Sequence, residues 1–457
     1  MHSVEAANSE VKDKSFYRIF FPLYFALVLQ NVITLSVNLA DNIMLGVYSE
    51  ASLSGVAAVN QIQFIYQQLV MALGDGIVMF CSQYWGKKDF KPMKRIMAIG
   101  MQSALIIAVI LFLLVSLFPS GAVSCFTTDE SIIAEGVSYL NIVRFTYLFF
   151  ALTQILLASL RSMEVVKIAF YLSILAFFVN CGINYILIFG HFGAPEMGVA
   201  GAAIGTLCAR ILEFAVLMVY LLTKFRKRFS LSFRDYLIFD KTLAGDYFKT
   251  TTPMLLVSGL WGLNTALQTV ILGHMTSAAI AANSAASNLY MMVKSSAVGS
   301  SSAAAVMIGK AIGTGDIPAV KKLSIRLQRM FVLLGILSGI LLFFLRIPVL
   351  RLYQLSPEAM DMAHTFLIIL SVVCVGMSYQ MPTNGGIIRG GGNAAFVVKM
   401  DLISIWCIVL PFSFFMAFVV KASPVVVVCC LNADQIFKCV PAFLESHYGN
   451  WIRKLTR

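Results

Sequence analysis

The chain has 457 residues, of which 59% are hydrophobic and only 12% are charged. Soluble domains carry about 25% charged residues, so this composition excludes an ordinary soluble protein and predicts repeated membrane spans. The formal net charge of +12 does not indicate nucleic-acid binding, because the lysines and arginines gather in loops on one side of the predicted spans.

The apolar segments follow one another along the chain, and each is long enough for a helix of roughly 20 residues to cross a bilayer. We therefore predict an all-α polytopic membrane protein with twelve transmembrane helices. In the last segment Asp434, Gln435 and Lys438 make the second half polar, and we expect that half to surface early. The predicted cores are 18–44, 55–80, 96–118, 138–160, 168–190, 198–222, 250–273, 280–308, 327–347, 362–386, 396–419 and 423–444.

The loops after the second, sixth and eighth segments, and the C-terminus, are rich in lysine and arginine. Loops on the other side are neutral or acidic. Because positive loops mark the cytoplasm, we expect both termini inside and a multi-pass protein of the plasma or inner membrane. Arg346 and Arg351 fall on the outer side and are exceptions to this topology.

The first segment carries Asn31, Thr34, Asn38 and Asp41 at spacings of three, four and three residues. On a helix this spacing places all four side chains on one face. An ionisable group at membrane depth is costly and usually marks a path for an ion or a substrate. The alternative is that Asp41 lies at the helix end and is merely solvated.

Several short motifs of the first half of the chain recur in the second half at a nearly constant offset. Since that offset covers an even number of spans, the two halves have the same orientation, as in parallel transporter repeats. Asp41 corresponds to Gln268, so the carboxylate occurs only in the first repeat. We predict an N-lobe (1–222), a cytoplasmic linker (223–246) and a C-lobe (247–457), with six spans per lobe. The matched pairs are Leu45-Gly46 with Leu272-Gly273, Gly86 with Gly313, Tyr139-Leu140 with Phe366-Leu367, and Arg161 with Arg389.

The motifs at 41–46 (DNIMLG), 82–86 (SQYWG) and 389–392 (RGGG), together with the twelve-span duplication, resemble the multidrug and toxic compound extrusion (MATE) family. The resemblance covers the chain from about residue 15 onward. It implies an antiporter with two lobes around a V-shaped cavity. Such proteins export amphipathic, often cationic compounds and are driven by inward movement of sodium ions or protons.

The resemblance also implies a cation-coupling site at Asp41, Asn180, Asn184 and Thr206. Asn180 and Asn184 are four residues apart and therefore share a helix face. Their oxygens suit Na⁺, and a desolvated carboxylate suits a proton. The alternative is that the asparagines only join helices by hydrogen bonds. Carboxylates that other family members carry at the position of Asn184, or on the seventh and tenth spans, are absent here, so the choice between Na⁺ and H⁺ stays open. We expect no other metal and no cofactor.

Polar stripes on several spans predict a substrate cavity, although ordinary helix packing explains most of the aromatic and methionine side chains. Arg210 and Glu213, three residues apart, are expected to neutralise each other. Asp75 lies near a cytoplasmic helix end and Asp401 begins the eleventh span, where each is expected to be hydrated or interfacial. The predicted cavity residues are Asn31, Thr34, Asn38, Gln63, Gln67, Tyr290, Lys294, Tyr379, Thr383 and Asn384.

These observations favour a secondary active exporter of amphipathic cationic compounds that acts as a monomer in the lipid bilayer. A flippase for lipid-linked oligosaccharide or peptidoglycan precursors is the first alternative, but it requires a cavity rich in cationic side chains. Such charges within the spans are few, mainly Lys294 and Arg210. An enzyme is the second alternative. With five histidines, the sequence places no histidine cluster, Ser/His pair or metal-ligand spacing at a common depth, so we expect no enzyme.

Overall fold

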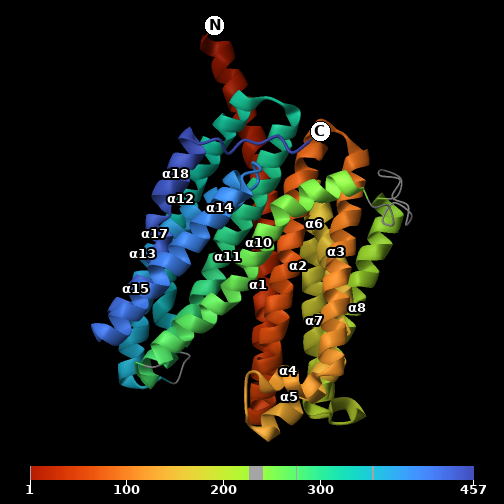
Figure 1. Ribbon diagram of the computed structural model, residues 1–457, viewed down its shortest axis with the longest axis vertical. Coiled ribbons are helices and arrows are strands. Elements are labelled where there is room, and N and C mark those ends of the chain that lie inside the picture. The colour runs from red at the N-terminus through yellow and green to blue at the C-terminus, as the bar shows by residue number, and fades with distance from the viewer. Residues whose placement is uncertain (1, 226–239, 274, 352–354, 457) are drawn as a thin grey trace. The chain divides into compact units, whose positions relative to one another are not determined.

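The computed structural model describes residues 2–225, 240–273, 275–351 and 355–456. These residues form helices and no β-strand (Figure 1). They divide into two compact units. We call residues Leu29–Cys81 and Lys88–Ser258 the N-unit, and residues Met1–Val28, Ser82–Lys87 and Gly259–Arg457 the C-unit. Most of the predicted linker, including its basic residues 226–228 and 234, lies outside the described residues.

The N-unit is a bundle in which α7 packs along α8, and α3 and α8 both pack against α6 (Figure 1). The short helices α4 and α5 lie at one end of this bundle. Asp129 caps α5, because its carboxylate accepts hydrogen bonds from the Ser131 hydroxyl at 2.7 Å and amide at 2.9 Å. These bonds hold the pKa of Asp129 below its usual value. The N-unit comprises parts of α1 (His2–Tyr48), α2 (Glu50–Lys87) and α10 (Lys241–Gly273), with α3 (Phe90–Leu117), α4 (Pro119–Ser124), α5 (Glu130–Val143), α6 (Thr146–Ser162), α7 (Lys167–Phe189), η1 (His191–Gly193), α8 (Gly198–Tyr220) and η2 (Leu221–Phe225).

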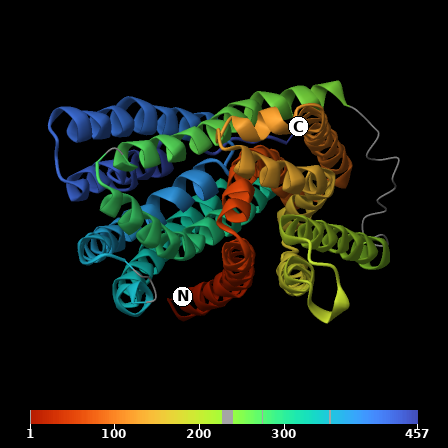
Figure 2. The ribbon, with the colours of Figure 1, turned by 90° about the horizontal axis from the view of Figure 1, so that it is seen from below.

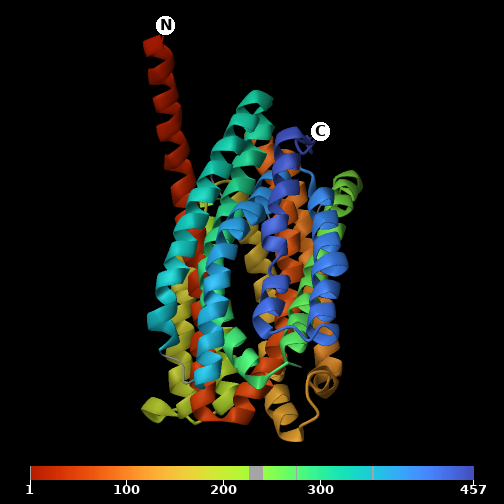
Figure 3. The ribbon, with the colours of Figure 1, turned by 90° about the vertical axis from the view of Figure 1, so that its left-hand side faces the viewer.

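In the C-unit, α11, α12 and α13 pack on one another, and Figures 2 and 3 both show α12 and α13 side by side. Phe366 and Leu367 of α13 are fully buried in the apolar core of this unit. The later helices are broken by π-helical turns. The elements are α11 (Ser277–Thr314), α12 (Ile317–Leu350), α13 (Pro357–Pro382), η4 (Thr383–Ile388), α14 (Ala394–Asp401), η5 (Leu402–Val409), α15 (Leu410–Phe414), η6 (Phe415–Val419), α16 (Pro424–Leu431), α17 (Asp434–Phe437) and α18 (Cys439–Tyr448).

Among the described residues, ten helices are long and apolar enough to cross a membrane, or eleven if the bent pair α5 and α6 forms one span. The chain is therefore an all-α polytopic membrane protein, as the sequence predicts. Each of the twelve predicted cores is mainly helical, and 250–273 lies within α10. The last predicted core lies within the apolar helical segment Pro424–Tyr448, and its polar residues Asp434 and Lys438 are buried within the protein.

Within the C-unit, the segment Ser82–Lys87 at the end of α2 crosses α11 at glycines that the internal repeat relates to each other. Gly86 lies near the end of α2, and its repeat-related partner Gly313 lies near the end of α11. A Cβ atom at Gly313 would overlap the carbonyl oxygen of Gln83, and one at Gly86 would overlap that of Lys310. Small residues of this kind let helix backbones approach closely in membranes. Repeat-related positions therefore meet in the fold.

We expect Gly313→Val to destabilise the protein by about 1–3 kcal/mol, because the added side chain has no room and must displace backbone. Gly259→Val is the matched control, since a Cβ at Gly259 has no atom within 4 Å. Thermal unfolding in detergent, followed by helical circular dichroism, measures both. Equal midpoints for the two variants would contradict the close crossing.

Candidate functional site

A chain of hydrogen bonds joins Asp41 to the three other residues of the predicted coupling site. Asn184 Nδ2 donates to Asp41 Oδ1 at 2.6 Å and lies 3.3 Å from Asn180 Oδ1. Asn180 Nδ2 in turn donates to Thr206 Oγ1 at 3.3 Å. Asn180 and Asn184 are almost completely buried. The structure thus brings all four predicted residues together within the N-unit.

Local helix geometry accounts for this arrangement. Asn180 and Asn184 lie one helical turn apart on α7 and so face the same neighbour, α8, which carries Thr206. Gly205 precedes Thr206 on α8, and a Cβ atom there would overlap Asn184 Oδ1. The missing side chain at Gly205 therefore makes the space in which the Asn184 amide reaches Asp41.

We expect Gly205→Ala to push the Asn184 amide away from Asp41. A hydrogen bond to a charged group contributes about 1.5–3 kcal/mol, so the affinity of the site for its coupling ion should fall by about tenfold or more. Gly182→Ala on α7 is the control, because a Cβ at Gly182 has no atom within 4 Å. The rise in unfolding temperature with Na⁺, or with decreasing pH, measures ion affinity. If both variants responded like the wild type, Gly205 would have no role in the site.

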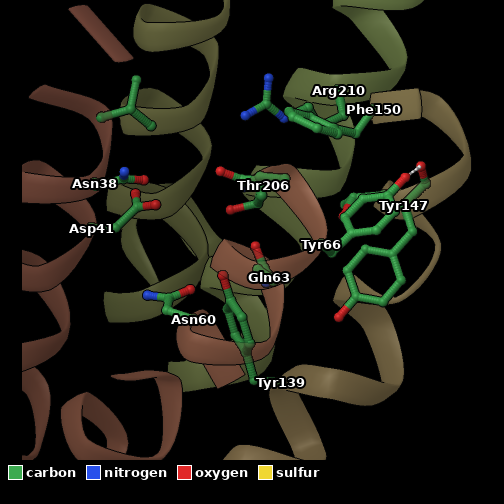
Figure 4. Close-up of a pocket in the computed structure, with 13 residues that line it drawn as sticks. Asn38, Asp41, Asn60, Gln63, Tyr66, Tyr139, Tyr147, Phe150, Thr206 and Arg210 are labelled. Carbon is green, nitrogen blue, oxygen red and sulfur yellow. Dashed lines mark hydrogen bonds between the residues drawn. The ribbon is translucent and has the colours of Figure 1, made fainter. Parts of the chain in front are cut away.

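A small cavity opens beside Asp41 in the N-unit (Figure 4). About 50 Å³ of it is accessible to a water-sized molecule. That is room for a few waters or a small cation, and far below the roughly 300–1,000 Å³ of a site for a drug-sized molecule. Its lining residues are Val37, Asn38, Asp41, Asn60, Gln63, Tyr66, Gln67, Tyr139, Thr146, Tyr147, Phe150, Thr206 and Arg210.

Two buried polar atoms near this cavity, Asn184 Oδ1 and Tyr147 Oη, have no hydrogen-bond partner among the described residues. Buried polar groups in proteins are nearly always satisfied by protein, water or ions. Asp41 and Thr206 both line the cavity, and their carboxylate and hydroxyl oxygens are donors of the kind that a hard cation such as Na⁺ prefers. The described residues contain no group of three or more His, Cys, Asp or Glu that could hold a metal.

Arg210 lines the same cavity but is not a free cation. Its Nη1 donates to Glu213 Oε2 at 2.7 Å, and its guanidinium lies 5.4 Å from the centre of the Phe150 ring (Figure 4). The predicted Arg210–Glu213 pair is therefore confirmed. Glu213 is buried, and its carboxylate is occupied by the guanidinium of Arg210.

The residues predicted to line a cavity in the N-unit divide into two groups. Asn38, Gln63 and Gln67 line the cavity beside Asp41. Asn31 and Thr34 are not among its lining residues, and the Thr34 hydroxyl instead donates to the carbonyl of Gln30 in its own helix. The shared helix face therefore extends beyond the cavity.

The remaining predicted cavity residues belong to the C-unit. The Tyr290 hydroxyl donates to Met377 Sδ at 3.0 Å, and Lys294 Nζ lies 5.0 Å from the centre of the Trp261 ring. The Tyr379 hydroxyl donates to Gln328 Oε1 at 2.7 Å. The two others, Thr383 and Asn384, begin the π-helical turn η4 and are buried.

One residue of the cavity beside Asp41 was not predicted from the sequence as a site residue. Tyr139 of α5 is buried and lines the cavity beside Asp41. The sequence holds a signal for Tyr139, because the second repeat has Phe366 in place of Tyr139, just as it has Gln268 in place of Asp41.

Asp75 was expected to be hydrated, but it pairs with Arg161 Nη2 at 3.3 Å. Asp401, expected at the interface, pairs with the buried Lys438 at 2.9 Å. In both cases the partner lies on a helix far away in sequence.

The family model described as MatE matches this chain twice, over residues 26–186 and 253–415. The starts of the two matched blocks are separated by the same offset as Leu45-Gly46 and Leu272-Gly273 of the internal repeat. The recurring motifs and the paired match thus both indicate a duplicated chain.

Curated relatives match over most of their length. "Probable multidrug resistance protein YoeA" of Bacillus subtilis is 26% identical over 414 residues, which cover 88% of this chain and 86% of that protein. "Probable multidrug resistance protein NorM" of Thermotoga maritima is 24% identical over 438 residues, covering 94% and 92%.

Solved structures share the fold at low identity. A Vibrio cholerae MATE transporter superposes with a TM-score of 0.87 at 15% identity and covers 97% of this chain and 98% of its own. A eukaryotic MATE transporter gives a TM-score of 0.82 at 17% identity and covers 96% of each chain.

Proposed function

Because the chain belongs to the MatE family, we propose that it is a secondary active transporter that exports amphipathic, cationic organic compounds in exchange for Na⁺ or H⁺. The names of its relatives as multidrug resistance proteins support export of foreign compounds. We also propose that it acts as a monomer in the cell membrane with both termini in the cytoplasm, and that six-span N- and C-lobes alternate access.

The observation that carries this proposal is the Asp41 site. A carboxylate lies among the buried amides of Asn180 and Asn184, beside a cavity with room for a few waters or a small cation. A charge held at such a site is costly unless a partner neutralises it. The site therefore suits binding and release of one coupling ion rather than direct binding of the organic compound.

The proposed cycle uses the change of charge at Asp41. In the outward-facing state the carboxylate takes up a proton or Na⁺, which neutralises it. The packing of α1 against α7 and α8 then changes, with Pro22 inside α1 offering a bend point. This change favours release of the compound outside and return to the inward-facing state, where the ion leaves.

Flipping of a lipid-linked phosphate compound is less well supported. That function needs cationic side chains available to hold phosphate groups. Arg210 is engaged by Glu213, and Lys438 is engaged by Asp401 and Asp434. Two of the cations within the helices are thus already occupied.

Purified protein in liposomes tests the function. Ethidium, a fluorescent organic cation, is added with an imposed Na⁺ gradient, an imposed proton gradient, or neither. We expect ethidium movement against its gradient with one of the two ion gradients. Movement of a fluorescent lipid between leaflets, without ethidium transport, would instead support the flippase.

A further inference from the structure

The C-unit contains a buried group of charges that the proposed cycle does not use. Lys438 Nζ lies 2.9 Å from Asp401 Oδ1 and 3.0 Å from Asp434 Oδ2. The Lys438 and Asp434 side chains are only 3% and 7% exposed, whereas Asp401 is 30% exposed. Asp434 lies near the middle of the apolar segment Pro424–Tyr448. The single ammonium group of Lys438 thus forms ion pairs with two carboxylates, those of Asp401 and Asp434. We call these three residues the Lys438 triad.

A line of amides extends from the triad to an unsatisfied atom. Gln435 Nε2 donates to Asp434 Oδ2 at 2.9 Å, and Gln380 Nε2 donates to Gln435 Oε1 at 2.8 Å. Asn384 Nδ2 donates to Gln380 Oε1 at 3.2 Å. Asn384 is 4% exposed, and its Oδ1 has no partner among the described residues. The line therefore ends at a buried acceptor in the π-helical turn η4, and such turns are frequent at functional sites.

The charges of the triad do not balance. Two carboxylates and one ammonium leave one negative charge in a region where unpaired charge is costly. A further cation, Lys294 of α11, interacts with the charges of Asp434 and Lys438 but lies over the Trp261 ring and forms no ion pair among the described residues. Tyr290 of α11 also interacts electrostatically with Asp434.

The internal repeat relates the triad to the Asp41 site. Asp434 and Lys438 follow Thr206 and Arg210 at the same offset that separates Arg161 and Arg389. In the N-unit, these positions hold a hydroxyl and a paired cation beside the carboxylate of α1. In the C-unit, where Gln268 replaces that carboxylate, the acidic group lies at the position of Thr206 instead. Each repeat therefore has one carboxylate without a cation of its own. It is Asp41 of α1 in the first repeat and Asp434 of α17 in the second.

We propose that the Lys438 triad is a second proton-binding centre, in which Asp434 takes up one proton and Lys438 stays charged. The proton comes from water by way of the partly exposed Asp401 and forms an O–H bond on Asp434. On release it returns to water, so no other reactant is needed. Protonation leaves the triad neutral, with Lys438 paired to Asp401 alone. The use of this centre in transport rests on the exporter function proposed above.

The ligand is a proton rather than Na⁺ because the cation position is already filled. The Lys438 ammonium occupies the space between the two carboxylates at hydrogen-bond distance from both. A sodium ion would have to displace it, whereas a proton adds to Asp434 without moving any heavy atom. With both termini cytoplasmic, Asp401 lies toward the cytoplasmic end of its segment, which would connect Asp434 to that side.

Infrared difference spectroscopy of the full-length protein in lipid, between alkaline and acidic pH, tests the proposal without any substrate. The C=O stretch of a protonated carboxyl group reports the titration. We expect Asp434→Asn to lose one component of this band. Asp361→Asn, which changes an exposed carboxylate of α13, should keep it. If Asp434→Asn retained the full band, the triad would only join helices and the proposal would be wrong.

If Asp434→Asn does not fold, the Lys294→Met variant provides a second test in the same titration. Removing a nearby positive charge makes protonation of Asp434 easier, so the midpoint of the band titration should move to higher pH. A purely structural triad predicts no movement, and an unchanged midpoint would overturn the proposal. Because neither titration needs transport, failure of the exporter function in liposomes would leave these outcomes unaffected and be recognised separately.

Discussion

Asp41→Asn is expected to remove the ion dependence of transport. The asparagine preserves the size of the side chain and can still accept the hydrogen bond from Asn184, which is 2.6 Å in the wild type. It cannot take up a proton and carries no charge for Na⁺. Coupling free energies between two binding sites are typically about 1–3 kcal/mol, or 5- to 150-fold in affinity. Gradient-driven uptake should therefore fall by a factor in that range toward the rate without a gradient.

The liposome assay with ethidium measures this loss directly. Gln268→Asn is the matched control, because it places the same side chain at the repeat-related position of the C-unit. We expect this control to keep its ion dependence. Comparison of Na⁺ and proton gradients in the wild type identifies the ion. If Asp41→Asn moved ethidium with unchanged dependence on that ion, Asp41 would not be the coupling residue.

The part of this site that the sequence could predict depends on local spacing. Asn38 and Asp41, and likewise Asn180 and Asn184, lie one turn apart within apolar segments, and helix periodicity places each pair on one face. The cost of polar groups in a membrane then suggests that the faces meet. Both steps use only residues close together in the chain, and the structure confirms that these pairs converge.

The rest of the polar interior depends on partners distant in sequence. Asp434 and Lys438 make their segment look too polar to remain in the membrane. Asp401, on a preceding helix, supplies the pairing that lets Lys438 stay buried. Asp75 is likewise engaged by Arg161 from another helix. Helix periodicity does not reveal such partners. The sequence alone therefore predicts that these charged side chains are hydrated. Tyr139 was missed because a lone tyrosine in an apolar helix usually only packs.

Arg210→Met should destabilise the protein more than any other single change considered, by about 3–5 kcal/mol. The substitution preserves much of the apolar length that packs near Phe150 but leaves the carboxylate of Glu213, only 5% exposed, without its cation. Breaking a buried pair from one side has this cost because the remaining charge is uncompensated. Adding Glu213→Gln removes that charge, so the double variant should recover most of the lost stability.

Thermal unfolding in detergent separates this explanation from loss of packing. If charge is the cause, Arg210→Met unfolds at a much lower temperature, and the double variant lies near the wild type, since replacing both members of a buried pair is often nearly neutral. If the contact with Phe150 is the cause, the single and double variants fall equally. Equal loss would therefore refute the electrostatic role of the pair. Recovery would show that Arg210 is the counter-ion of Glu213, which leaves Asp41 as the carboxylate of this cavity that can bind the coupling ion.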